Sequence, residues 1–237
     1  PEVEGLEGYE LKNWICSQGS GYIDLGIPPT NDAKFEIEFM ITSDQAASSA
    51  QYLTGSRYNN NGLQYFTLTG NTNSPHQFRG TFMGEYKVLS RWYRESGVRY
   101  RESMEVKLSY GSETAYRGYL TFQKYDGASW LTHTDSTRAV EGGISNTGAA
   151  AAAAGIPSDA PIPNILVFAT RPNTANSHSG MKLYHYRIWI NGTLQHDFIP
   201  CQRMADGSVG VYDMVGTNGF LEPYHFPSAP AFTVGND

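Results

Sequence analysis

The chain has 237 residues, a formal net charge of −6, and 13% aromatic residues against only 17% charged residues. An acidic balance excludes the concentrated basic surface that phosphate binding needs, which argues against a nucleic-acid partner. No apolar run approaches the roughly 20 residues of a membrane helix and no signal-like apolar region opens the chain, so membrane insertion is not expected. This length fits one large β-sandwich, and we predict a single domain.

The first elements are a polar lead-in and two strand regions. Residues 1–13 carry four glutamates among glycines and are predicted to be a linker with little to bury. A first strand region is expected from Trp14 to Gly26, and Pro28-Pro29 then forces a turn. From Ala33 to Ile41, apolar residues alternate with mostly charged ones, which predicts a half-buried antiparallel strand.

The middle of the chain reads as further sheet. Residues 51–55 and 62–69 are predicted strands, separated by an Asn-rich tip at residues 57–62, and several period-two runs follow between Gly80 and Gln123. Arginines and glutamates are interleaved here, and we interpret them as a solvated face with cross-strand ion pairs. The residues concerned are Arg79, Arg91, Arg94, Arg99, Arg101, Glu85, Glu95, Glu102 and Glu105.

Asp126-Gly127 predicts a turn before Trp130, and residues 141–160 form a Gly/Ser/Ala-rich stretch that we expect to be a flexible loop. The alanine run at residues 149–154 is shorter than the ~12 residues that an isolated helix needs. The apolar segment Ile165 to Thr170 predicts a strand buried on both faces.

The last part of the chain predicts a hairpin and a third strand. The arm from Lys182 to Ile190 ends in Asn191-Gly192, a pair typical of a type I′ turn, and the returning arm is expected to stop at Pro200. Asp206-Gly207 then turns the chain into a strand over residues 209–215. Alternation along the first arm assigns Tyr184, Tyr186, Ile188 and Ile190 to the core, and Leu183, His185, Arg187 and Trp189 to the other face.

Three stretches carry a family resemblance: SGYIDLG near the start, then DFIPCQR, and DGSVGVYD followed by a closing aromatic. They resemble the laminin-G-like jelly-roll domains of the concanavalin A-like lectin/glucanase superfamily, which are frequent in gut-bacterial surface proteins and phage structural proteins. The resemblance implies an all-β fold over residues 14–237, a single antiparallel β-sandwich of jelly-roll type with little or no helix. It also implies an extracellular, cell-surface or virion location.

The sequence offers little catalytic apparatus. Glucanases of this superfamily use carboxylates two residues apart on one strand face, whereas here Glu36 and Glu38 form one pair and Met40 occupies the third place. Glu102 and Glu105 have the wrong parity, and we interpret all four as solvated strand-face residues. No metal-binding His motif and no GxSxG elbow occurs, so we predict that the chain is not an enzyme.

The resemblance leaves open whether the chain holds a structural calcium ion and whether its two cysteines form a disulfide. Asp24 and Asp213 lie in the family words and are candidate ligands of a structural calcium ion, or else residues that accept hydrogen bonds from backbone amides. No other cofactor is expected. Because a jelly roll often brings its first and late strands together, Cys16 and Cys201 form either a disulfide or two buried free thiols.

Binding through aromatic and polar side chains remains. Sugar rings stack on aromatic faces, while amides and guanidinium groups bind their hydroxyls. The candidate ligand-binding residues are Trp189, Arg187, Trp92, Tyr93, Tyr58, Asn60 and Trp130. We expect a noncatalytic module that binds glycan or another surface ligand. The alternatives are a structural or adhesive domain of a phage particle or surface appendage, with contacts to a virion protein or a second copy, and a divergent glycoside hydrolase.

Overall fold

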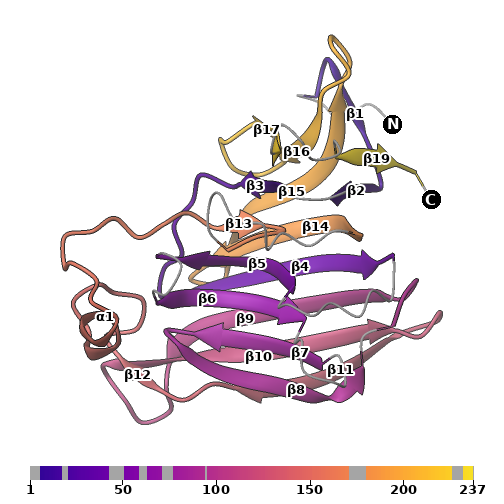
Figure 1. Ribbon diagram of the computed structural model, residues 1–237. Helices are drawn as coiled ribbons and strands as arrows, with labels where there is room; N and C mark the ends of the chain where they lie inside the picture. The colour runs from indigo at the N-terminus through magenta and orange to yellow at the C-terminus, as the bar shows by residue number, and fades with distance from the viewer. Residues whose placement is uncertain are drawn as a thin grey trace.

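The computed structural model describes residues 6–17, 21–42, 51–58, 63–70, 77–93, 95–170, 180–225 and 232–236. Two sheets pack face to face, and all the described strand pairings are antiparallel (Figure 1). The prediction of an all-β antiparallel sandwich with little helix is confirmed.

The larger sheet has twelve strands. Its main path, in spatial order, is β11 (Trp130–Ser136), β10 (Ala115–Tyr125), β9 (Arg99–Leu108), β4 (Ala33–Ile41), β14 (Met181–Ile190), β15 (Thr193–Arg203), β16 (Val209–Asp213) and β17 (Phe220–Leu221). Four short strands join it from the side: β1 (Tyr9–Leu11) on β15, β12 (Val140–Glu141) on β10, and β2 (Trp14–Ser17) on β14 and on β19 (Thr233–Gly235).

The smaller sheet has seven strands and lies in front of the larger one in Figure 1. Its order is β18 (Tyr224–His225), β3 (Gly21–Asp24), β13 (Leu166–Val167), β5 (Gln51–Arg57), β6 (Gln64–Gly70), β7 (Gln77–Phe82) and β8 (Glu85–Tyr93).

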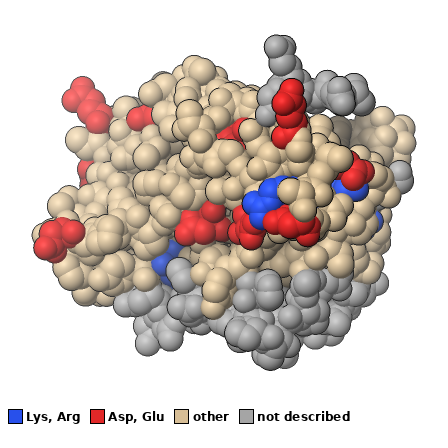
Figure 2. Space-filling view, turned by 90° about the horizontal axis from the view of Figure 1, so that it is seen from above, with Lys and Arg blue, Asp and Glu red and all other residues tan. Residues whose placement is uncertain are grey.

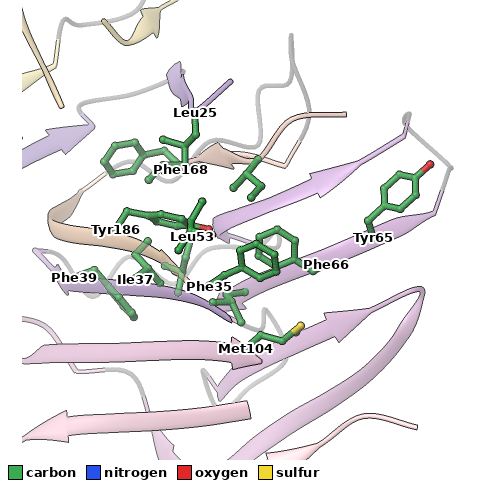
Figure 3. Packing of buried hydrophobic residues seen from close by; sticks show 14 of the residues in the cluster. Leu25, Phe35, Ile37, Phe39, Leu53, Tyr65, Phe66, Met104, Phe168 and Tyr186 are labelled. Carbon is green, nitrogen blue, oxygen red and sulfur yellow. The ribbon is translucent and has the colours of Figure 1, made fainter. Parts of the chain in front are cut away.

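Aromatic rings fill the space between the sheets. Alternation along β4 turns Phe35, Ile37 and Phe39 inward, and all three are at most 1% exposed. The ring of Phe35 stacks on that of Phe66 from β6 at 4.4 Å between centroids, so the two sheets are joined by direct ring contact (Figure 3). Such contacts add to the apolar burial that stabilises the sandwich.

The hairpin β14–β15 turns where expected, with φ of 50° at Asn191 and 78° at Gly192, the conformation of a type I′ turn. The predicted alternation along β14 holds from His185 onward, but a bulge between Leu183 and His185 shifts the register. Leu183 is therefore a core residue with no exposure, contrary to the prediction from strict alternation.

Two strand predictions were wrong in extent. β15 runs through Pro200 to Arg203, because a proline lacks only the donor and its carbonyl still accepts a bond from Lys12 N at 2.9 Å. Residues 165–170 are all buried as predicted, but only Leu166 and Val167 form a strand, since Phe168 has a φ of 69°.

The Ala-rich stretch is ordered by packing. A five-residue helix, α1 (Ala149–Ala153), replaces part of the predicted flexible loop, and Ala151 is fully buried in the core cluster. Asn146 accepts a hydrogen bond from the Tyr65 hydroxyl, which fixes this segment to β6. Tertiary contacts thus stabilise a helix too short to form alone.

The lead-in also contributes structure. Leu6 is only 7% exposed and β1 pairs with the edge of β15, so part of residues 1–13 belongs to the sandwich instead of forming a linker. Within the described residues, no helix is long and apolar enough to span a membrane. The face in Figure 2 carries scattered acidic side chains with the basic ones beside them, and no concentrated basic patch is visible there.

Candidate functional site

The outer face of the larger sheet carries a dense set of polar and aromatic side chains, which we call the polar face. Strands with one face against the core must present alternate residues to the other side, and here those residues are charged, amide or aromatic. The polar face consists of Lys34, Glu36 and Glu38 from β4, Arg99 and Arg101 from β9, Gln123 from β10, Trp130 from β11, His185, Arg187 and Trp189 from β14, and Asp197 from β15.

Glu38 lies at the centre of the polar face and binds two guanidinium groups. Arg99 Nη2 lies 2.6 Å from Glu38 Oε1, and Arg101 Nη2 donates to Glu38 Oε2 at 2.9 Å. The Glu38 side chain is only 5% exposed. A carboxylate this buried requires such partners, because desolvation of an unpaired charge is costly.

Glu36, two residues before Glu38 on the same face of β4, is likewise bound by two basic side chains. Lys34 Nζ donates to its Oε2 at 2.9 Å, and Arg187 Nη1 donates to its Oε1 at 3.4 Å. Arg187 continues the network across the sheet, with its Nε 3.3 Å from Asp197 Oδ1. His185 Nδ1 lies 3.2 Å from the same Asp197 oxygen. Ion pairs therefore link four adjacent strands, β9, β4, β14 and β15.

Aromatic rings lie over these cations. The Arg101 guanidinium is 4.4 Å from the ring centroid of Trp130, and Lys34 Nζ is 4.4 Å from that of Trp189. Both tryptophans are partly exposed. The Arg99 guanidinium carbon lies 4.0 Å from the ring centroid of Tyr184, because the β14 bulge brings Tyr184 close to this face. These contacts hold the rings in fixed positions.

The carboxylates of the polar face are occupied by their partners. Both oxygens of Glu38 are bound by arginines, and both oxygens of Glu36 by Lys34 and Arg187. The interpretation of Glu36 and Glu38 as solvated residues was wrong, because they are 9% and 4% exposed within this network. The same interpretation of Glu102 was also wrong. Its side chain faces the core with no exposure, and neither carboxylate oxygen has a hydrogen-bond partner in the described part of the chain.

Asp213 and Asp24 both bind backbone amides. Asp213 Oδ2 lies 2.6 Å from His196 Nδ1, and its Oδ1 accepts from Gly216 N at 2.9 Å. Burial alone would raise the pKa of Asp213, but the hydrogen bonds from His196 and Gly216 outweigh it and lower that pKa. Asp24 Oδ1 accepts from Gly26 N at 2.8 Å, as in an Asx turn. The two aspartates lie on different sheets, and no cluster of three or more His, Cys, Asp or Glu suited to a metal occurs within the described ranges.

The two cysteines are free thiols. Cys16 on β2 is 5% exposed and Cys201 on β15 is fully buried. Of the two alternatives, the structure therefore has buried thiols, and each side chain packs as a small apolar group.

The structure brings together three of the seven predicted ligand-binding residues. Trp189 and Arg187 from β14 share the polar face with Trp130 from β11, a strand distant from β14 in the sequence. Tyr58 follows β5 in the other sheet and packs against the core cluster. Asn60 lies outside the described residues, and so do the side chains of Trp92 and Tyr93, whose backbone belongs to β8.

Sequence reasoning missed Glu38, Arg101 and His185 as members of the same site. The alternation of β4 and β9 contains a signal for them, since Glu36 and Glu38 share one strand face and Arg99 and Arg101 another. The pairing of β4 with β9 places these faces side by side.

No family model matches this chain, and no curated protein matches it. Among solved structures, a sialidase from Trypanosoma rangeli in complex with 2,3-difluoro-KDN is similar in fold, with a TM-score of 0.41 and 11% sequence identity. The match covers 77% of this chain and 26% of the sialidase chain, so this chain spans about a quarter of that protein.

Proposed function

We propose that the chain is a noncatalytic glycan-binding module that binds an oligosaccharide on the polar face. The observation that carries this proposal is the presence of two partly exposed tryptophans, Trp130 and Trp189, on the same face as a network of ion-paired arginines and carboxylates. Flat aromatic rings take the apolar faces of sugars, and fixed polar groups bind their hydroxyls.

The dimensions of the face favour an extended ligand. From β11 to β14 the sheet advances by four strand spacings, which is roughly 19 Å at about 4.8 Å each. This length suits several linked sugars better than one ring. Because cross-strand partners already hold the guanidinium groups in place, little side-chain entropy is lost when a ligand binds.

The occupied carboxylates support a role without catalysis. A glycosidase needs one carboxyl group to protonate the leaving oxygen and another to attack or to activate water. On this face the oxygens of Glu36 and Glu38 are bound by basic side chains. A module of this kind works where glycans are displayed, such as a cell or virion surface.

A glycan-array screen of the purified chain tests the proposal, with calcium and with chelator in parallel. We expect reproducible binding to a defined set of oligosaccharides and loss of that binding in Trp130→Ala and Trp189→Ala. Binding that survives both substitutions would move the site elsewhere on the molecule. No binding on a broad array would overturn the proposal in favour of a structural or adhesive role.

A further inference from the structure

A hollow lies on the outer face of the smaller sheet, away from the polar face of the larger sheet. Its volume is about 290 Å³, and it is lined by Leu63, Gln64, Arg79, Thr81, Gly84 and Tyr86, with Ala154 after α1 closing one side. None of these residues belongs to the polar face. The volume is close to the lower end of the range of about 300–1,000 Å³ that is typical of small-molecule sites.

The hairpin β7–β8 builds this hollow. Arg79 and Thr81 are two residues apart on β7 and so share one face, and Thr81 pairs directly with Tyr86 on β8. Met83 and Gly84 make the turn with φ of 46° and 81°, and Gly84 N donates to Gln64 O at 3.0 Å. The lining side chains are therefore held by paired backbone.

Arg79 differs from the arginines of the polar face. Its guanidinium lies 5.5 Å from the ring centroid of Tyr86, but no carboxylate pairs with it among the described residues. Within the part of the chain that the structure describes, its Nε is buried without a hydrogen-bond partner, as are those of Arg99 and Arg101, so the missing carboxylate is what distinguishes Arg79. The neighbouring acid, Glu85, lies 4.0 Å from Arg138 Nε. An arginine in this state attracts an anion, because a guanidinium group bonds readily to carboxylates.

Thr81 gives an independent indication of a ligand. It is only 3% exposed, it lines the hollow, and its hydroxyl has no hydrogen-bond partner among the residues that the structure describes. A buried hydroxyl without a partner costs free energy, and a bound polar molecule would remove that cost. The Gln64 side chain adds an amide to the same wall, and Tyr86 beside it is 63% exposed.

We propose that this hollow binds a uronic acid, that is, a single sugar residue bearing a carboxylate. The carboxylate pairs with Arg79, the ring hydroxyls bond to Thr81 and Gln64, and an apolar face of the sugar packs against Tyr86. This combination of cation, hydroxyl, amide and ring matches an acidic sugar better than a neutral sugar or a simple anion. The proposal does not depend on the function assigned to the polar face.

Titration calorimetry and ligand-observed NMR with D-galacturonate and D-glucuronate test the proposal on the whole chain. Neutral D-galactose tests the need for the carboxylate, and acetate tests the carboxylate without the sugar. We expect a uronate to bind at least about tenfold more tightly than galactose or acetate. Arg79→Gln should weaken uronate binding by about tenfold or more, and Thr81→Val should weaken it by a smaller factor.

Two controls separate this site from general effects of charge and of exposed aromatic residues. Lys107→Gln removes one positive charge from an exposed position on the other sheet, and Tyr110→Ala removes a fully exposed ring from a turn outside both proposed sites. Both variants should bind uronate as the parent does, and each variant's thermal unfolding shows whether it is folded. The proposal is overturned by equal affinity for galactose, by acetate binding as tightly as a uronate, by uronate binding that survives Arg79→Gln, or by no uronate binding at all.

Discussion

Trp130 lies over Arg101 with 4.4 Å between the guanidinium carbon and the ring centroid, while Nη2 of the same arginine donates to Glu38 at 2.9 Å. One arginine on β9 thus connects a partly exposed ring on β11 with a buried carboxylate on β4. The Arg101 guanidinium supports the Trp130 ring and is itself held by Glu38. The ring is therefore pre-organised, as a rigid ligand-binding surface requires.

Removing the charge of Glu38 should destabilise the fold. In Glu38→Gln the guanidinium groups of Arg99 and Arg101 lose their shared carboxylate, and we expect the free energy of unfolding to fall by about 1–3 kcal/mol. Glu105→Gln is the matched control. The Glu105 side chain is 47% exposed and, among the described residues, pairs only with Lys107, so its loss should cost less than about 1 kcal/mol. Urea denaturation measures both, and equal losses would contradict the buried network.

The His196–Asp213 contact should make stability depend on acid pH. The pKa of Asp213 is lower in the folded chain than its ordinary value of 3.8. Its contribution is therefore complete above about pH 4 and is lost as the pH falls through the folded pKa. We expect Asp213→Asn to lower the free energy of unfolding by about 1–2 kcal/mol at neutral pH. This difference from the parent should become smaller in acid.

The control for this prediction is Asp159→Asn, which removes the same charge from an exposed position. The free energy of unfolding of Asp159→Asn should stay close to that of the parent at each pH. Denaturant titrations at a series of pH values measure the effect, and a constant difference for Asp213→Asn across the acid range would rule out the proposed linkage.

Glu102 should give the opposite pH dependence. Burial raises its pKa well above the ordinary value of 4.5, so the folded chain holds a proton that the unfolded chain releases. Stability is then highest below about pH 4.5 and falls as the pH rises toward the folded pKa. We expect Glu102→Met, which removes the unpartnered carboxyl from the core, to stabilise the chain by about 1–3 kcal/mol at neutral pH.

Glu105→Met is the control for Glu102→Met, since it makes the same substitution on the outward face of the same strand. It should leave the slope of stability against pH unchanged, whereas Glu102→Met should flatten it. A destabilised Glu102→Met variant would mean that the carboxyl group has a partner in solution.

The two cysteines should be unreactive in the folded chain. Burial raises the pKa of Cys201 to about 12 and also raises that of Cys16, so neither forms a thiolate readily at neutral pH. We expect a thiol reagent to label neither cysteine in the native protein and both after unfolding without reductant. Absence of both thiols from the unfolded, unreduced protein would indicate the Cys16–Cys201 disulfide.

Local patterns in the sequence predicted much of the fold. Alternation identified β4 and the outward positions of Arg187 and Trp189, and Asn191-Gly192 identified the β14–β15 turn, because these features depend on neighbouring residues alone. The β14 bulge was missed, since a single extra residue changes parity without any mark in the sequence. The extension of β15 past Pro200 depended on pairing with other strands.

The site was less predictable because it is made by long-range pairing. Glu38 and Arg101 are 63 residues apart and meet only because β4 and β9 are adjacent in the sheet. The inward position of Glu102 follows from the same register, which places it beside Ile37 and Phe122. Residue type favoured a solvated carboxylate there, and only the register shows that it is buried.

The most direct test of the glycan-binding account is the affinity of Trp130→Ala for an oligosaccharide selected on the array, measured by calorimetry beside the parent chain. Tyr110→Ala serves as the matched control, because Tyr110 is a fully exposed aromatic residue in a turn. The account predicts at least about a tenfold loss of affinity for Trp130→Ala, unchanged affinity for Tyr110→Ala, and similar unfolding temperatures for all three proteins. Unchanged affinity for Trp130→Ala would contradict the account.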